Sequence, residues 1–206
     1  GTGVWRPKKL GIPGESRGDV LYAINYLANP DGHDVGETVA VIGAGNTAVD
    51  VARTCLRKGA RNVTLYARST KIRATDEEVA YAKLDGAEFK FCRQICEIND
   101  EGPVFKLVIM DDEGNAIGYA DELEQEKADT TIIAISQSPK DKLINTTDGL
   151  KGSEKGFLIT DENGKTTCER VYASGDVVFG ARTVVEAVAF SKKVADAMDL
   201  DMSLNG

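Results

Sequence analysis

Residue types that often mark catalysis or metal binding are scarce in this chain of 206 residues, which has one histidine and four cysteines. No two cysteines form a C-x-x-C pair, so the sequence predicts neither a metal site nor a redox pair. We interpret the cysteines as reduced thiols packed beside a sheet, without assigned chemistry; they are Cys55, Cys92, Cys96 and Cys168. The five prolines against 21 glycines indicate tight turns in a folded chain rather than disorder.

Excess positive charge and long apolar runs are also lacking. The formal net charge is −8 and the isoelectric point is near 4.8, a balance that repels nucleic acids and anionic membranes. No apolar run is long enough to span a bilayer, and residues 1–15 lack the apolar core of a signal peptide. We therefore expect a cytoplasmic protein with neither nucleic acid nor membrane as a partner.

The most regular pattern is a strand, a helix and a second strand in the first third of the chain. Residues 38–42 read TVAVI, an uninterrupted run typical of a strand buried on both faces. Residues 46–58 carry apolar side chains at helical spacing, and Gly59 stands where a helix commonly ends. With a strand over 61–67, these residues have the size of a parallel βαβ unit.

The remaining elements are predicted from shorter signals. Thr75 and Glu78 are in capping-box register for a helix that ends at Gly86. The apolar pattern lapses between Pro139 and Lys155, where we place a domain boundary. We also expect a helix over 20–27, strands over 87–91 and 129–136, a hairpin of 92–98 with 104–110, two short strands around Asn163-Gly164, a strand through RVYASGD, and a final helix over 183–198.

A glycine motif lies between the first strand and the first helix of the βαβ unit. It has the form G-x-G-x-x-A, in which the glycines permit a tight turn and a close approach to a pyrophosphate, and the alanine permits close packing of helix on strand. Unpaired amides and the helix dipole at this point attract phosphates. The alternative is a glycine turn that binds nothing. The motif predicts a dinucleotide site at Gly43, Ala44, Gly45, Asn46, Thr47 and Ala48.

The end of the second strand bears on which dinucleotide binds. An NAD site usually has a carboxylate there for the ribose hydroxyls, but residues 65–75 contain none. Arg68, Lys71 and Arg73 instead gather positive charge suited to a 2′-phosphate. We predict NADPH rather than NADH; the alternative is a solvated basic loop. The missing acid also argues against S-adenosylmethionine.

Several segments together resemble the small subunit of glutamate synthase and related flavoprotein reductases that bind two dinucleotides. They are GTGVWRPKKLGIPGE, AVIGAGNTAVDVARTCLRKGARNVTLYAR, EEVAYAKLDGAEF, TIIAISQSP, and VYASGD followed by GARTVVEAVAFSKKVADAM. The resemblance covers nearly the whole chain. It implies an α/β fold: a three-layer Rossmann-like NAD(P)H-binding domain with a parallel sheet and an antiparallel meander over 20–138, the C-terminal part of an FAD-binding domain over 139–206, and a connecting segment over 1–19.

The resemblance also implies roles for individual residues. Gly43–Ala48 would bind the NADPH pyrophosphate and Arg68 the 2′-phosphate, with Lys71 or Arg73 contributing where relatives often have a second arginine. Ala134 and Ser136 lie on the returning strand, where Ser136 replaces a common glycine. The flavin site would include Gly175 and Asp176, which reaches the ribityl chain or a phosphate, and the helix amides near Thr183 and Val184, which face the ring.

In the intact protein, the resemblance implies hydride transfer from NADPH to FAD and onward to an electron-accepting subunit or domain, with iron–sulfur centres as one route. No flavin-binding segment precedes Gly1, so we interpret the chain as a portion of such a protein, inactive alone, whose uncovered final helix promotes self-association. No catalytic acid, base or nucleophile is predicted, because the cofactors carry the chemistry. Two alternatives remain: a non-catalytic dinucleotide-binding module, and an interaction surface with no cofactor site.

Overall fold

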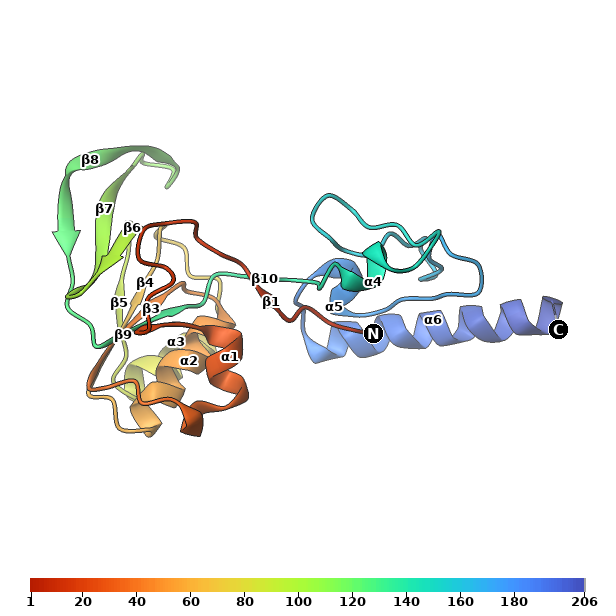
Figure 1. Ribbon diagram of the computed structural model, residues 1–206, viewed down its shortest axis with the longest axis horizontal. Coiled ribbons are helices and arrows are strands. Elements are labelled where there is room, and N and C mark those ends of the chain that lie inside the picture. Colours follow the sequence, from red (N-terminus) through yellow and green to blue (C-terminus); the bar gives the residue numbers. More distant parts are fainter. Residues whose placement is uncertain (206) are drawn as a thin grey trace. The chain divides into compact units, whose positions relative to one another are not determined.

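The computed structural model describes residues 1–205, with side chains through residue 204. The chain divides into two compact units (Figure 1). The first unit is Lys9–Ile135; the second combines Gly1–Lys8 with the chain from Ser136 onward. Among the described residues, no helix is both long and apolar enough to cross a membrane.

A parallel sheet of five strands forms the centre of the first unit, in the order β2-β9-β3-β4-β5. Its strands are β2 (Val20–Tyr22), β3 (Thr38–Ile42), β4 (Asn62–Tyr66), β5 (Glu88–Lys90) and β9 (Thr130–Ile133). In β3, four of the five side chains are buried, which agrees with a strand covered on both faces.

Helices cover one face of this sheet. They are α1 (Ala23–Ala28), α2 (Asn46–Arg57) and α3 (Asp76–Leu84), which lie together in Figure 1; the short 3-10 helix η1 (Pro30–Gly32) follows α1. Val39 and Val41 of β3 point to this side and join a core with Val49 and Val51 of α2. These side chains lie two residues apart in the strand, as one face of a strand requires.

An antiparallel sheet covers the other face. Its strands are β6 (Arg93–Asn99), β7 (Gly102–Met110) and β8 (Ala116–Gln125), in that order. Ala40 and Ile42 of β3 join a second core with Ile95 and Phe105 of the meander. Helices, parallel sheet and meander therefore make three layers, and the predicted α/β fold class is confirmed.

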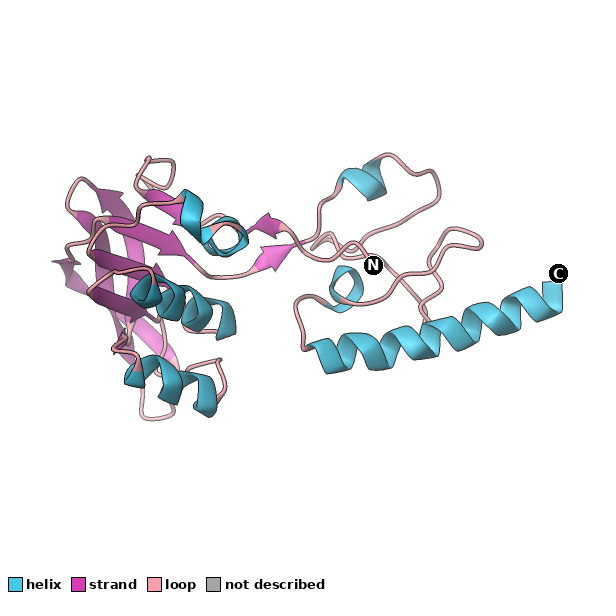
Figure 2. Ribbon diagram, turned by 90° about the horizontal axis from the view of Figure 1, so that it is seen from below, coloured by secondary structure: helices cyan, strands magenta, loops and turns pink. Residues whose placement is uncertain are grey.

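The second unit contains little regular structure apart from one long helix, α6 (Val184–Asn205), which stands out among loops in Figure 2. Its other elements are β1 (Arg6–Pro7), β10 (Gln137–Ser138), α4 (Lys142–Asn145) and α5 (Asp176–Phe179). A small core of Leu150, Leu158, Ala173 and Val177 holds the loops together.

The βαβ unit and its helix ends match the sequence prediction closely. The strand over 38–42 has the predicted bounds, and Gly59 and Gly86 follow their helices with φ of +108° and +104°. The hydroxyl of Thr75 accepts a hydrogen bond from the Glu78 amide at 3.4 Å. These elements were predictable because each is specified by residues close in sequence.

Other predictions were wrong. Residues 20–27 form β2 followed by α1, because Val20–Tyr22 pairs with β9. No strand runs through RVYASGD among the described residues; Tyr172 makes only an isolated bridge to Lys165. The final helix continues to Asn205, seven positions beyond the predicted end at 198, and strand β8 was not predicted.

Phe105 links the two sheets of the first unit. Its ring is fully buried and stacks on Tyr66 of β4 with ring centres 4.4 Å apart. We expect Phe105→Ala to lower the free energy of unfolding by roughly 3–5 kcal/mol, because it removes buried surface and leaves a cavity. Leu123→Ala on exposed β8 is the control, with an expected change of about 0.5 kcal/mol or less. Urea unfolding measures both; equal effects would contradict this packing.

Glu15 fastens the segment before β2. Its carboxylate accepts hydrogen bonds from the amides of Leu10 and Gly11, both at 2.7 Å, and from the Tyr22 hydroxyl at 3.0 Å. Burial alone would raise the pKa of this carboxyl, but these hydrogen bonds outweigh burial and hold the pKa below its ordinary value. A lowered folded-state pKa means that the ionised form stabilises the fold.

This stabilisation is present above the pKa of the unfolded chain and is lost as pH falls through the lower, folded-state pKa. We therefore expect Glu15→Gln to destabilise the chain at pH 7 by roughly 1–3 kcal/mol. The difference from the wild type should shrink in acid, below the ordinary value of 4.5. Urea unfolding at pH 7 and at a pH below 4.5 tests this. Glu101→Gln, at an exposed position, is the control. A difference that is the same at both pH values would refute the role of the ionised carboxylate.

Candidate functional site

The carboxyl ends of β3 and β9 meet in the first unit at the point where the order of the sheet reverses. From β3 the chain proceeds through α2 to β4 and β5 on one side, and it returns to β9 on the other. Gly43 and Ala134 are the first residues after these two strands. Open α/β sheets bind ligands at such a point, and the predicted residues Gly43 and Ala134 lie together there.

Gly43 occupies a position that only glycine fits. Its φ is +137°, a conformation that residues with a side chain rarely adopt. A Cβ at Gly43 would lie 2.4 Å from the carbonyl oxygen of Ala134 and 3.6 Å from the Cβ of Ala48. Ala48 is itself fully buried where α2 packs on the sheet. The tight turn and the close packing predicted for Gly43 and Ala48 are therefore both present.

The turn leaves a run of backbone amides without a protein partner. Gly45 precedes α2 and no side chain caps that helix; the amides of Ala48 and Val49 both donate to the Gly45 carbonyl, at 2.9 and 3.1 Å. Within residues 1–205, the amides of four consecutive residues, Ala44, Gly45, Asn46 and Thr47, donate to no protein group. A Cβ at Gly45 would meet no atom within 4 Å. Open amides at a helix start form a site suited to an anion.

The basic loop, residues 68–75, follows β4 and returns to the glycine turn. The amides of Arg73 and Ala74 donate to the Ala44 carbonyl, at 2.9 and 3.2 Å. Arg68, Lys71 and Arg73 are exposed, and none forms an ion pair with another described residue. The structure therefore brings a loop with unpaired positive charge next to the open amides, where it can receive an anionic group.

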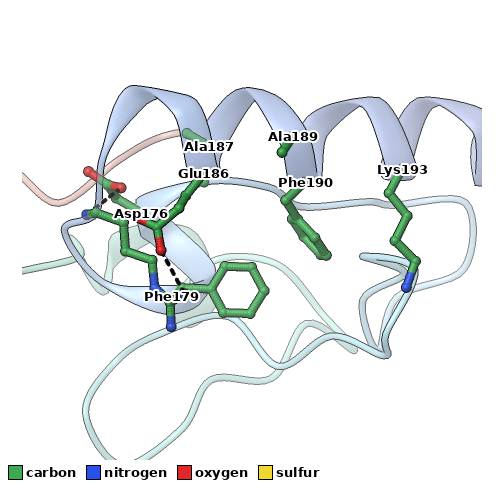
Figure 3. A pocket seen from close by; sticks show the side chains of 9 residues that line it. Asp176, Phe179, Glu186, Ala187, Ala189, Phe190 and Lys193 are labelled. Carbon is green, nitrogen blue, oxygen red and sulfur yellow. Dashed lines mark hydrogen bonds and ion pairs between the residues drawn. The ribbon is translucent and has the colours of Figure 1, made fainter.

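The other predicted residues lie in the second unit. The Ser136 carbonyl accepts a hydrogen bond from the Lys8 amide at 3.0 Å, beside the pairing of β1 with β10. Gly175 and Asp176 line a cavity of about 330 Å³ between α5 and the first turns of α6 (Figure 3). The structure therefore places Gly175 and Asp176 together, and assigns Ser136 and Ala134 to different units.

The start of α6 is partly capped by the protein itself. The Thr183 amide donates to the Glu186 carboxylate at 3.1 Å, and the Thr183 hydroxyl accepts from the Glu186 amide at 3.3 Å. The hydrogen bonds from the hydroxyl and amide of Thr183 lower the pKa of Glu186. The Val184 amide donates to no group in the described part of the chain. Of the two amides expected to face a flavin ring, only that of Val184 is open.

Several side chains in this cavity were missed by the sequence predictions. Glu186, Phe190 and Lys193 line it from one face of α6, and Phe179 contributes from α5. Their spacing of four and three residues was the available signal for a shared helix face. The sequence T-V-V-E at 183–186 also fits the capping box that the structure forms. In addition, Arg182 lies 5.0 Å from the centre of the Phe179 ring, and its amide donates to Asp176 at 3.3 Å.

The early part of α6 carries exposed apolar side chains. Val184, Val185 and Val188 are 78%, 77% and 49% exposed, and Ala189 is also exposed. Self-association through this face stays a prediction.

Known proteins similar to this chain include small chains of glutamate synthase and a subunit of formate dehydrogenase. The glutamate synthase [NADPH] small chain of Azospirillum brasilense is 30% identical over 96% of this chain and 47% of the relative. The corresponding small chain of Halomonas elongata is 28% identical over 96% and 48%. The beta subunit of NADP(+)-dependent formate dehydrogenase from Moorella thermoacetica is 30% identical over 96% and 30%. The chain thus spans about half the length of the glutamate synthase small chains it matches.

Solved structures show the same fold. The thioredoxin reductase of T. acidophilum superposes with a TM-score of 0.75 at 23% sequence identity, over 97% of this chain and 64% of that protein. The resemblance predicted from the sequence motifs is confirmed as a distant relationship over most of the chain. Because the pyridine nucleotide-disulphide oxidoreductase family matches residues 1–190, the chain belongs to that family.

Proposed function

We propose that this chain is the NADPH-binding part of a flavin-dependent oxidoreductase, which passes a hydride from NADPH to FAD and electrons onward to an acceptor. The observation that carries the proposal is the run of four open amides, from Ala44 to Thr47, at the reversal point of the parallel sheet. Backbone donors at a helix start suit a pyrophosphate, which accepts several hydrogen bonds at once. Membership of the family supports a dinucleotide as the source of that pyrophosphate.

The basic loop supports NADPH over NADH. Arg68, Lys71 and Arg73 are unpaired in the described part of the chain, and no carboxylate stands between 65 and 75 to accept from ribose hydroxyls. The three relatives named above carry NADPH or NADP(+) in their names. We assign the 2′-phosphate to Arg68, with Lys71 or Arg73 as further contacts.

The cavity of the second unit supports a flavin contact in the intact protein. We propose that Gly175, Asp176 and the start of α6, at Thr183 and Val184, contribute to FAD binding. When bound, the two cofactors supply the hydride chemistry; this chain binds and orients them. The further partner is an electron-accepting subunit or domain, for which an iron–sulfur protein is one candidate. A cytoplasmic location agrees with four cysteines that form no disulfide.

Substitutions at the two glycines of the turn should affect cofactor binding and folding differently. Gly45 has φ −99° and ψ 178°, which alanine adopts without strain, and an added Cβ would meet no protein atom within 4 Å. We expect Gly45→Ala to preserve stability but weaken NADPH and NADH binding alike, by roughly tenfold or more, since the pyrophosphate can no longer approach. Gly43→Ala is the contrasting variant: it should destabilise the fold itself, because the added Cβ meets the Ala134 carbonyl.

Calorimetric titration and thermal unfolding measure the two effects. If the folded Gly45→Ala variant bound NADPH and NADH as tightly as the wild type, the proposal that the pyrophosphate binds at this turn would be contradicted.

Arg68 tests the choice of cofactor. If its guanidinium binds the 2′-phosphate, Arg68→Ala should weaken NADPH binding by roughly tenfold or more, the loss expected for a charged hydrogen bond, and leave NADH binding nearly unchanged. Arg61→Ala is a matched control, because Arg61 lies at the opposite end of β4 and pairs with Glu37 at 3.6 Å. Parallel calorimetric titrations decide the matter. An equal loss for both cofactors would contradict a contact specific to the 2′-phosphate.

A further inference from the structure

Helix α3, which follows the basic loop, is held by few apolar contacts. Only Val79 and Ala82 of its nine residues are buried. Apolar burial therefore contributes little to fixing this helix, and polar contacts must account for much of its placement. The position of the basic loop depends on the same contacts, because the loop runs directly into α3.

Polar contacts tie α3 to α2 at both ends. Arg53 of α2 pairs with Asp85, just past the last turn of α3, at 2.7 Å and with Glu78, in its first turn, at 3.2 Å. At the near end, the Thr75 amide donates to the side-chain oxygen of Asn46 at 3.2 Å. Thr75 is also the cap of α3. One side chain of the glycine turn therefore holds the residue at which the basic loop ends and the helix begins.

Asn46 stands between the two halves of the proposed site. Its backbone amide belongs to the open run at the start of α2, while its side chain reaches across to the basic loop. The other bonds between turn and loop, from Arg73 and Ala74 to the Ala44 carbonyl, join backbone atoms only. Of these three hydrogen bonds, only the one accepted by the Asn46 side chain can be removed directly by a substitution, because the other two join backbone atoms.

We infer that Asn46 is a positioning residue that fixes the basic loop relative to the pyrophosphate amides, and thereby sets the preference for a dinucleotide carrying a 2′-phosphate. The inference rests on the proposed function. Attraction between the loop and a 2′-phosphate weakens with distance and with screening by salt. A loop already fixed in place loses less conformational entropy on binding than a loose one. The unphosphorylated cofactor lacks the group that this charge would contact, so its affinity depends less on the position of the loop.

The test compares NADPH and NADH binding to the full chain by calorimetry. Asn46→Ala keeps the backbone amide for the pyrophosphate and removes only the acceptor for Thr75. We expect NADPH binding to weaken roughly three- to tenfold, the range for one lost hydrogen bond, and NADH binding to weaken less, so that the ratio of NADPH affinity to NADH affinity falls. Amide hydrogen exchange at Thr75 should become faster in the same variant, without any cofactor present.

Two further variants complete the design. Asn46→Asp retains an oxygen acceptor, so slow exchange at Thr75 and the NADPH-to-NADH affinity ratio should both recover towards wild type. Its negative charge would weaken binding of both cofactors through the pyrophosphate they share. Arg53→Met is the matched control, since it removes both ion pairs between α2 and α3 and leaves the hydrogen bond from Thr75 to Asn46 in place; it should lower stability and leave the affinity ratio unchanged.

The outcomes distinguish the two proposals. A wild-type chain that binds neither cofactor would overturn the proposed function, and this inference with it. If the wild-type chain binds the cofactors but Asn46→Ala leaves the ratio of NADPH affinity to NADH affinity unchanged, or weakens binding of both cofactors equally, only the role of Asn46 would be overturned. A drop in the ratio of the same size in Arg53→Met would likewise reject it, because general anchoring of α3 would then explain the effect.

Discussion

The turn at Gly43, packed against the Ala134 carbonyl, is the constraint on which the proposed site depends. Because β3 and β9 are adjacent and parallel, their carboxyl ends deliver the two residues to the same place, and a Cβ at Gly43 would lie 2.4 Å from the Ala134 oxygen. The positive φ of Gly43 turns the chain into α2 without an intervening capping side chain. Four amides stay open as a result, and the carbonyl of Ala44 remains available to hold the basic loop. The fold thus places four open amides, a geometry suited to an anion, beside a cationic loop.

The sequence was sufficient wherever structure is specified by neighbouring residues. The run 38–42, the helix from Asn46, the Thr75 cap and the glycines at 59 and 86 all depend on signals within a few residues. The tight turn at Gly43 and the close packing of Ala48 follow from the same local pattern. Ala134, more than eighty positions away, was assigned to the returning strand through the resemblance to known reductases; the parallel pairing of β3 and β9 brings it beside Gly43 in this structure.

The sequence was insufficient where pairing between distant segments decides. Val20–Tyr22 has an apolar spacing that also fits a helix, and it becomes a strand because β9 offers a partner. Strand β8 is mostly exposed and acidic, so it carries no alternating pattern that reveals it. The tie from Asn46 to Thr75 joins residues 29 positions apart through one side chain, and no spacing rule predicts such a contact. The early part of α6 is apolar yet exposed, so its pattern alone did not show what it packs against.

The central claim is that the open amides after Gly43 receive the pyrophosphate of the cofactor. The most direct measurement is nuclear magnetic resonance of the 15N-labelled chain during titration with NADPH, because each backbone amide is observed separately. The account predicts that the largest changes in chemical shift fall on Ala44, Gly45, Asn46 and Thr47, the residues whose amides have no protein partner in the described chain. Saturation with NADPH while these four signals stay in place would contradict it.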